Sequence, residues 1–437
     1  MSARKTVYLA MSADLIHSGH IDIIEQGAKY GDVVVGILTD EVIASYKRAP
    51  FFDYKTREKI ISNIKQVTNI VKQETLDYTE NLLKLKPDYV IHGDDWKTGI
   101  QRLVRQRVIE TLSQWGGQLI EIPYNKDFEF ANLDDQAKSI NNTPDIRRRK
   151  LKTLLTLKPF IRVMEASNGL TGLIVENVSI EDEETATVKE YDAMWLSSLC
   201  DSTFKGKPDI ELVDLTSRIS TLNEIMEVTT KPIILDGDTG GKPEHFSFNV
   251  KTLERLGVSA IIIEDKTGLK QNSLFGTDVA QTLENPQLFA EKIRAGKRAQ
   301  ITREFMIFAR LESLIAGAGI ADAMDRAKIY VSAGADGIMI HSKEKDGKEI
   351  AEFLHAFRNY SKDIPLIVVP TSYNHITEQE LCQMGANIII YANHLLRSAY
   401  PAMLRTAKKI LECGRSQEVD DDIMPIKEVI SLIPGEK

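Results

Sequence analysis

Short apolar runs alternate with longer segments of helical period along nearly all of this 437-residue chain, and no other feature limits the fold as much. The runs have the length of strands, and the segments between them space apolar residues as a helix packed on a sheet requires. Repeated strand–helix units predict parallel sheets covered by helices. With 43% hydrophobic residues, the chain can bury a large core, and its length suits two or three domains. We therefore expect an α/β protein.

The first group of apolar runs lies within about the first 125 residues and fits one open, doubly wound sheet. The runs are residues 6–12, 32–40, 69–73, 88–95 and 118–124. Between residues 125 and 155 the alternation stops, and the chain becomes polar with a basic cluster at 147–150. Thr143 followed by Pro144 predicts the start of a helix there.

The second group holds eight apolar runs, each turning polar at its C-terminal end. They are residues 161–167, 192–199, 232–239, 260–266, 305–312, 337–343, 366–372 and 387–393. Eight such units predict a (β/α)₈ barrel. We therefore expect a Rossmann-like first domain at residues 1–130, a linker with a basic helix at 131–157, and a barrel at 158–437.

Composition limits the partners and the compartment. The formal net charge of −8 argues against a general nucleic-acid binder, and the first 150 residues are near neutral while the remainder is acidic. Three cysteines (Cys200, Cys382 and Cys413) form no CxxC pair, as expected for a reducing compartment. The N-terminus lacks a convincing signal peptide, and no apolar run has the roughly 18–20 residues that span a bilayer. We expect a cytoplasmic protein without a membrane segment.

The C-terminal ends of the barrel strands carry polar side chains, where a barrel of this kind places its active site. They are Glu165, Ser197, Asp236, Asp238, Glu264, Arg310, His341, Thr371 and Asn393. Asp236 and Asp238 are two residues apart, so we expect them on the same side of one strand. With Glu264 they form a set of hard oxygen ligands suited to Mg²⁺. The sequence predicts a site for an anion and a metal.

A loop that follows the fourth barrel run reads EDKTGLKQNS (264–273). It contains a glycine, two lysines and small polar residues. Such a loop can carry Lys270 over a phosphate-bearing substrate and exclude water.

In the first domain, His17-Ser18-Gly19-His20 follows the first apolar run and opens a helix. In a doubly wound sheet this position binds phosphates, because backbone N–H groups and the helix dipole face the anion. The two histidines lie on one helical face and can donate hydrogen bonds as negative charge develops.

HSGH and the later HGDDW (92–96) resemble the cytidylyltransferase branch of the HxGH nucleotidyltransferases, which transfer CMP from CTP to a phosphate or phosphonate and release pyrophosphate. The resemblance implies that His17 and His20 contact the triphosphate. It implies nucleotide contacts for Asp94 and Trp96, and phosphate contacts for Lys47 and Arg57. Relatives have a late Ser/Thr-rich motif, where this chain departs with SINNTP (139–144) followed by Arg147; by the resemblance, Thr143 and Arg147 take that role.

EDKTGLKQNS matches the phosphoenolpyruvate mutase signature EDKxGxKxNS, within the isocitrate lyase superfamily. The resemblance covers roughly residues 160–437 and implies interconversion of phosphoenolpyruvate and phosphonopyruvate. It implies that Asp236 ligates Mg²⁺ directly, with Asp238 and Glu264 acting mainly through its waters. The other implied site residues are Trp195, Ser197, Ser198 and Leu199 around the pyruvyl group, Arg310 and His341 on substrate oxygens, Lys270, Asn272 and Ser273 on the closing loop, and the catalytic Asp209.

Together the resemblances indicate a bifunctional enzyme of phosphonate biosynthesis. Its cytidylyl acceptor would be a small phosphonate such as 2-hydroxyethylphosphonate or 2-aminoethylphosphonate, and a phosphomonoester stays open. Two alternatives remain: a barrel that acts as a phosphonopyruvate hydrolase or a lyase, and a first domain that binds nucleotide without catalysis. The mutase pattern departs at Gly241-Lys242-Pro243, after the DGDTG segment. By resemblance we also expect a homo-oligomer, a dimer or tetramer formed through the barrel.

Overall fold

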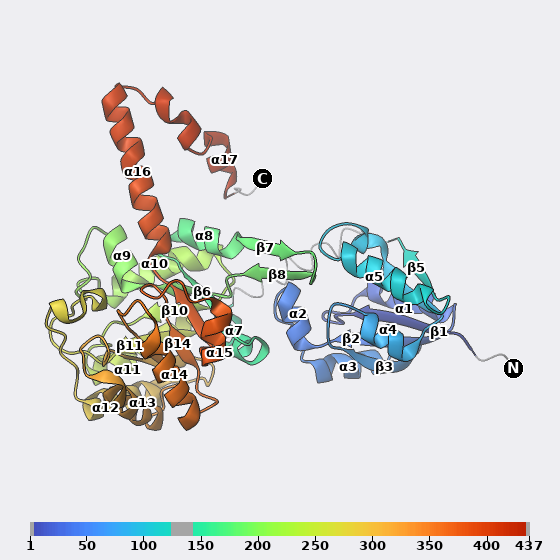
Figure 1. The fold of residues 1–437 in the computed structure, drawn as a ribbon, viewed down its shortest axis with the longest axis horizontal. Helices are drawn as coiled ribbons and strands as arrows, with labels where there is room; N and C mark the ends of the chain where they lie inside the picture. The colour runs from blue at the N-terminus through green and yellow to red at the C-terminus, as the bar shows by residue number, and fades with distance from the viewer. Residues whose placement is uncertain (1–3, 124–142, 434–437) are drawn as a thin grey trace.

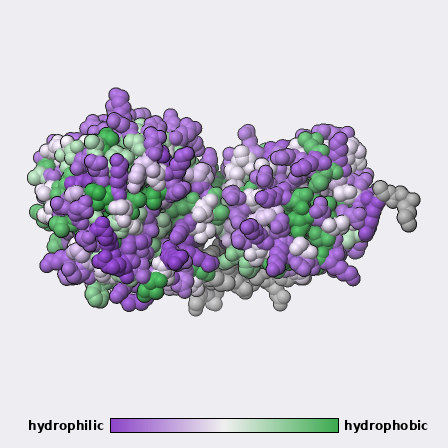
Figure 2. Space-filling view, turned by 90° about the horizontal axis from the view of Figure 1, so that it is seen from below, coloured by the Kyte–Doolittle hydropathy of each residue, from purple (hydrophilic) through white to green (hydrophobic). Residues whose placement is uncertain are grey.

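The computed structural model describes residues 4–123 and 143–433 and places them in two α/β units that form separate lobes (Figure 1 and Figure 2). The face seen in Figure 2 is largely hydrophilic on both lobes, with scattered apolar patches. None of the helices within the described residues is long and apolar enough to cross a bilayer. The expected cytoplasmic location stays a prediction.

The N-terminal unit is an open parallel sheet with strand order β3-β2-β1-β4-β5. Its strands are β1 (Thr6–Met11), β2 (Asp32–Leu38), β3 (Val67–Gln73), β4 (Tyr89–Gly93) and β5 (Gln118–Ile122). Its helices are α1 (Ser18–Ala28), α2 (Asp40–Tyr46), α3 (Tyr54–Ser62), α4 (Thr79–Leu85), η1 (Asp94–Lys97) and α5 (Arg102–Ser113). One face of the sheet packs on α1 and α3, and the other packs on α2, α4 and α5. The predicted doubly wound sheet is confirmed.

The C-terminal unit is a closed parallel barrel of eight strands. The strands are β6 (Ile161–Glu165), β9 (Ala193–Leu196), β10 (Ile233–Asp236), β11 (Ala260–Glu264), β12 (Met306–Leu311), β13 (Gly337–Ile340), β14 (Leu366–Val368) and β15 (Ile388–Tyr391). The helices between them are α8 (Gly169–Asn177), α9 (Ser198–Phe204), α10 (Leu215–Val228), α11 (Pro243–Leu256), η2 (Ser273–Asp278), α12 (Pro286–Ala299), α13 (Gly319–Ser332), α14 (Lys348–Tyr360) and α15 (Glu378–Met384). Each predicted barrel strand is present.

Helix α7 (Pro144–Leu157) covers the N-terminal end of the barrel. Thr143 is its N-cap residue, as predicted. Leu151 and Leu154 enter the apolar cluster inside the barrel, and Arg147 donates to the carbonyl of Thr229 (2.8 Å) just before β10. The basic cluster therefore includes buried contacts with the barrel as well as exposed charge.

Two features of the barrel unit have no counterpart in the strand–helix rhythm. An antiparallel hairpin, β7 (Ser179–Asp182) and β8 (Thr187–Glu190), leaves the barrel between α8 and β9 and reaches the N-terminal unit (Figure 1). After β15, the long helix α16 (His394–Cys413) projects away from the barrel and is followed by η3 (Gln417–Asp422) and α17 (Ile426–Ser431). The hairpin was not predicted, because its strands are only four residues long and carry no continuous apolar run.

Candidate active sites

The mouth of the barrel gathers the predicted residues from consecutive strands. Asp236 ends β10, Glu264 ends β11, and Arg310 lies in β12 directly beside Glu264 in the register. A cavity of about 60 Å³ is lined by Asp236 and Arg310 but not by Glu264 or Asp238. Its predicted lining residues are Trp195, Ser197, Ser198, Leu199, Asp209, Asp236, Lys270, Asn272, Ser273, Arg310, His341, Thr371 and Asn393.

Asp236 is a buried carboxylate held in its charged form. It accepts hydrogen bonds from the backbone N–H groups of Ser198 and Asp238, both at 3.1 Å. Burial by itself would raise the pKa of Asp236, but the cations of Lys270, Arg310 and Arg218 lower it to about 2. An ionised carboxylate with oxygen facing the cavity is the group that a hard cation requires.

Asp238 differs from the expected arrangement. Strand β10 ends at Asp236, so Asp238 lies in the following turn with a left-handed backbone (φ 52°) rather than on the same strand face. Its two carboxylate oxygens accept from Lys270 Nζ and from Arg218 Nη2. The same-face prediction was wrong because alternation holds only inside a strand, yet the turn keeps Asp238 beside Asp236.

Glu264 is buried and accepts no hydrogen bond, but Lys266 Nζ lies 3.5 Å from one carboxylate oxygen and Arg310 Nη1 lies 3.4 Å from the other. Burial raises its pKa to about 7, against the opposing effect of Arg310 and Lys270. Among residues 4–123 and 143–433, no group of three or more His, Cys, Asp or Glu side chains is arranged to hold a metal ion. The Asp238 carboxylate contacts the cation of Lys270 rather than a metal site.

Lys270 ties the loop after β11 across the mouth. Its Nζ donates to Ser198 Oγ (2.7 Å), to Asp209 Oδ1 (2.9 Å) and to Asp238. Asn272 Nδ2 donates to the other oxygen of Asp209 at 3.0 Å. Burial by itself would lower the pKa of Lys270, but the surrounding carboxylates raise it. The loop is therefore closed, with its lysine charged.

Glu312 contacts three residues of this site, and the sequence analysis did not identify it. It accepts from Arg310 Nε (2.5 Å) and Ser273 Oγ (2.5 Å), and His341 Nδ1 lies 3.3 Å away. Burial opposes ionisation, but Arg310 and His341 hold the pKa of Glu312 well below its usual range. Its place two residues after Arg310 was the only signal for it in the sequence.

Glu165 does not line the barrel cavity, although it ends β6. It accepts from the backbone N–H of Leu396 at 2.8 Å, and Cys200 Sγ lies 3.5 Å away. This buried carboxylate thus joins β6 to the start of α16.

The second site is a cavity of about 360 Å³ at the start of α1 in the N-terminal unit. His17 is the N-cap residue of α1, and its ring centre lies 4.0 Å from that of His20. His20 Nδ1 accepts from the backbone N–H of His17 (3.4 Å), which leaves Nε2 as the protonated nitrogen of a neutral ring. Burial, together with His17 and Lys47, lowers the pKa of His20 to about 4.

The other residues predicted for this pocket divide into two groups. Lys47 lines it, with Nζ donating to Ser12 Oγ at 3.2 Å. Arg57, Asp94, Trp96 and Thr143 are not among its lining residues. Arg57 is fully buried and donates to Asp40 and to the carbonyl of Ser12, so it supports the pocket from behind.

Trp96 packs against His92, a residue for which the sequence analysis predicted no role. The indole stacks on the ring of His92 with centres 3.8 Å apart, and its Nε1 donates to Glu121 at 3.0 Å. His92 itself lines the pocket. The HGDDW segment thus contributes His92 and Asp95, rather than Asp94 and Trp96, to the cavity wall.

Comparisons with known proteins agree with both halves of this arrangement. Residues 151–411 match the phosphoenolpyruvate phosphomutase family, and residues 12–149 match the cytidylyltransferase-like family. A phosphoenolpyruvate phosphomutase from Tetrahymena pyriformis is 35% identical over 65% of this chain and 90% of its own length. A phosphonopyruvate hydrolase from Variovorax sp. (strain Pal2) is 32% identical over 67% of this chain and 96% of its own.

A solved structure of phosphonopyruvate hydrolase in complex with oxalate and Mg²⁺ is similar to the barrel unit, with a TM-score of 0.57 and 30% identity. The match covers 65% of this chain and 94% of that one. Since one family match spans more than half of the residues, this chain belongs to the phosphoenolpyruvate phosphomutase family and carries a cytidylyltransferase-like domain at its N-terminus.

Proposed function

We propose that this protein is a bifunctional enzyme whose barrel interconverts phosphoenolpyruvate and phosphonopyruvate, and whose N-terminal domain transfers CMP from CTP to a small phosphonate. The observation that carries the first activity is the closed loop: Lys270 bonds Ser198, Asp209 and Asp238 across the barrel mouth. A phosphoryl group that leaves one atom of the substrate and returns to another must be protected from water in between. A closed, cation-lined cavity provides that protection.

The acidic residues of the mouth fit Mg²⁺. Asp236 is ionised, and Glu264 is a buried carboxylate that makes ion pairs with Lys266 and Arg310 but accepts no hydrogen bond, so its oxygens could still accept from the waters of a bound cation. Asp236 would hold the metal, and Asp238 and Glu264 would act through its bound waters. When bound, Mg²⁺ supplies a Lewis acid that polarises the substrate's oxygens.

The chain's own cations orient the substrate and balance its charge. Arg310 and His341 line the cavity and are held by Glu312, so they present fixed donors to phosphoryl or carboxylate oxygens. Lys270 lies on the closing loop and places a positive charge in the cavity, where it can stabilise a loose, metaphosphate-like group. Asp209 anchors both Lys270 and Asn272 in the closed position.

Mutase and hydrolase activities are separated by one experiment. Phosphorus NMR of the full-length protein with phosphonopyruvate and Mg²⁺ should show phosphoenolpyruvate forming before any inorganic phosphate. Phosphate and pyruvate without phosphoenolpyruvate would replace the mutase assignment with the hydrolase. Chelation of the metal should stop either reaction, and added Mg²⁺ should restore it.

For the N-terminal domain, support comes from the two adjacent histidines at the start of α1 facing a pocket that Lys47 also lines. His17, neutral His20 and Lys47 are placed to donate to the triphosphate as charge builds on the phosphate under attack. The acceptor's phosphonate oxygen forms the new P–O bond, and pyrophosphate leaves. Pyrophosphate release from CTP with 2-aminoethylphosphonate, 2-hydroxyethylphosphonate or phosphocholine tests both activity and acceptor. Tight CTP binding without release under all three conditions would make this domain a nucleotide-binding module.

The projecting C-terminal segment supports assembly with a second copy. Helix α16 has no buried residue, and beyond the half-buried Leu395 and Leu396 at its start its large apolar side chains are exposed, with Leu411 at 84%. Exposed apolar side chains continue along α17, including Ile426 and Ile430. An isolated chain would leave this amphipathic arm in water, whereas exchange with a partner barrel would cover it. Light scattering should give a dimer or tetramer, and Leu411→Glu should shift it towards monomer.

A further inference from the structure

The β7–β8 hairpin belongs to the barrel by sequence but packs in the N-terminal domain. Ala186, at its tip, is fully buried with a left-handed backbone (φ 56°). Its methyl group joins the apolar cluster of the N-terminal sheet, which includes Val42, Ile43 and Val104. A residue contributed by the barrel is therefore part of the first domain's core.

Polar contacts fix the same tip against α5. Arg102 Nη2 lies 3.3 Å from Glu183 Oε2, and Arg107 Nη2 donates to the carbonyl of Glu184 at 3.1 Å. The charged pair is exposed and contributes little stability by itself. The pair instead helps to orient the hairpin tip against α5.

The other partner of the hairpin is α2. Strand β8 packs directly against this helix, whose Val42 and Ile43 share the cluster with Ala186. Helix α2 is only seven residues long, too short to hold its own position without tertiary packing. Contacts with β8 therefore help to determine where its C-terminal end lies.

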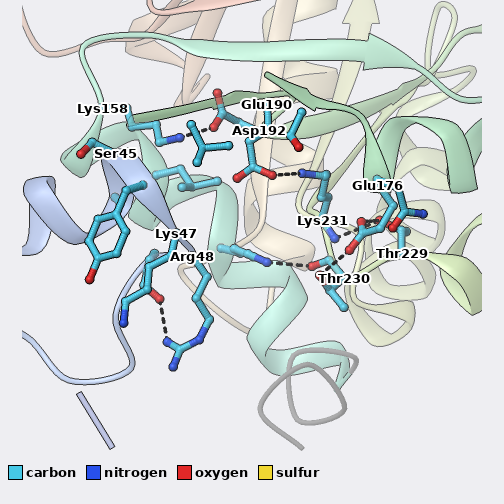
Figure 3. A pocket seen from close by; sticks show the side chains of 18 of the residues that line it. Ser45, Lys47, Arg48, Lys158, Glu176, Glu190, Asp192, Thr229, Thr230 and Lys231 are labelled. Atoms are coloured by element: carbon cyan, nitrogen blue, oxygen red, sulfur yellow. Dashed lines mark hydrogen bonds and ion pairs between the residues drawn. The ribbon is translucent and has the colours of Figure 1, made fainter. Parts of the chain in front are cut away.

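The C-terminal end of α2 carries cationic side chains of the cavity beside His17 and His20, which we call the HxGH pocket. Lys47 is the C-cap residue of α2, and Arg48 follows it and pairs with Asp14 at 2.8 Å. Tyr46, Lys47 and Arg48 line the HxGH pocket and also a cavity of about 680 Å³ between the domains. Figure 3 shows Ser45, Lys47 and Arg48 on one side of this second cavity and Glu190 and Lys231 of the barrel domain on the other.

We propose that the β7–β8 hairpin of the barrel domain is a positioning element of the nucleotidyl-transfer site, which holds α2 and thereby Lys47 against the triphosphate pocket. The inference rests on the proposed cytidylyl transfer. It makes the barrel a structural part of the first site while leaving the barrel's own mouth untouched. The hairpin lies between α8 and β9, and Lys231, next to it in the cavity, precedes β10 at the opposite end of the barrel from the mouth.

The test compares Ala186→Asp with Ala186→Gly in the full-length protein. Aspartate places a charge in the apolar cluster and should drive the tip out, whereas glycine keeps the left-handed backbone and removes one methyl group. We expect kcat/KM for CTP to fall by about 10²-fold in Ala186→Asp, the size of a displaced positioning group. We expect Ala186→Gly, and Lys189→Ala on the exposed side of β8, to stay within about 2-fold of wild type. Phosphoenolpyruvate formation should be unchanged in all three.

Hydrogen exchange separates positioning from general stabilisation. In Ala186→Asp, amide protection should fall in Asp40–Tyr46 and persist in the central strands β1 and β2. Replacing residues 182–187 with an Asn-Gly turn should give the same pattern. Unchanged transfer in Ala186→Asp, or equal loss of protection across the whole N-terminal sheet, would overturn the proposal.

The experiment also distinguishes failure of this inference from failure of the proposed function. If wild-type protein releases no pyrophosphate with any acceptor, cytidylyl transfer is wrong. The hairpin is then judged by the affinity for CTP in calorimetry and by the exchange of α2. A CTP Kd that is the same in wild type and Ala186→Asp, with unchanged α2 protection, would refute the positioning role by itself.

Discussion

The barrel mouth and the HxGH pocket both collect cations for phosphate groups, but they hold them differently. In the mouth, Lys270 and Arg310 are buried and braced by carboxylates, around a cavity of about 60 Å³. In the HxGH pocket, a neutral His20 and a lysine that bonds the hydroxyl of Ser12 face about 360 Å³. The first arrangement suits a reaction that must exclude water, and the second suits entry of a large triphosphate and a second substrate.

The largest expected effect comes from the metal carboxylate of the mouth. Asp236→Ala should lower phosphoenolpyruvate formation by on the order of 10³-fold or more, because about 4 kcal/mol of transition-state stabilisation corresponds to that factor. Asp236 belongs to the barrel and does not line the HxGH pocket, so CTP-dependent pyrophosphate release should stay at the wild-type rate. Parallel assays of both activities on one preparation check this.

The reciprocal change is His17→Ala. Loss of one preorganised donor at a phosphate should reduce cytidylyl transfer by about 10²–10³-fold. The mutase reaction should not change, as measured by phosphorus NMR. Loss of both activities in either variant would contradict independent chemistry at the two sites, since the two cavities share no lining residue.

Glu312→Gln tests how strongly mutase activity depends on the charge of Glu312. Glutamine keeps the shape but removes the charge that Arg310 and Ser273 contact, and a hydrogen bond to a charged group contributes about 1.5–3 kcal/mol. We expect a 10–100-fold fall in mutase kcat/KM, with the larger part in kcat if Arg310 acts mainly in the transition state. Ser342→Ala, beside His341 but bonded to Glu349, is the matched control. Equal losses in the two variants would remove the special role of Glu312.

Sequence patterns predicted whatever depends on regular periodicity. The eight strand ends follow from alternation and strand order, so the sequence predicts Asp236, Glu264, Arg310 and His341 at one barrel mouth. The HSGH segment was located because it follows β1 directly. These features depend on neighbours within one strand–helix unit.

The features that were missed depend on contacts between distant segments. Arg218, on α10, reaches Asp238 across 20 positions, and no motif marks it. Arg57 resembled a pocket cation, but its burial against Asp40 and Ser12 is set by packing of α3 on the sheet. The β7–β8 hairpin was overlooked because its strands are short and polar, and its importance comes from one buried alanine in another domain.

The smallest expected effect concerns the neutral histidine of the open pocket. Burial lowers the pKa of His20 to about 4, below its ordinary value of 6.5, so the unfolded chain binds a proton more readily than the folded one. The stability of the N-terminal domain should therefore be highest above pH 6.5 and decline as pH falls from 6.5 towards 4. His17 and Lys47, the charged or titratable neighbours, act in the same direction.

His20→Gln removes this titration while retaining a polar side chain. In wild type, protection of the β1 and β2 amides against exchange should weaken more between pH 7.5 and pH 5 than it does in the variant, after correction for the intrinsic exchange rate. Barrel amides in β11 and β12 serve as the internal reference, since His20 contacts neither strand. An identical pH response in the two proteins would mean that folding leaves the pKa of His20 at its ordinary value, and the open pocket would then not hold His20 neutral through burial, in contrast to the fixed charges that the barrel mouth builds with Lys270 and Arg310.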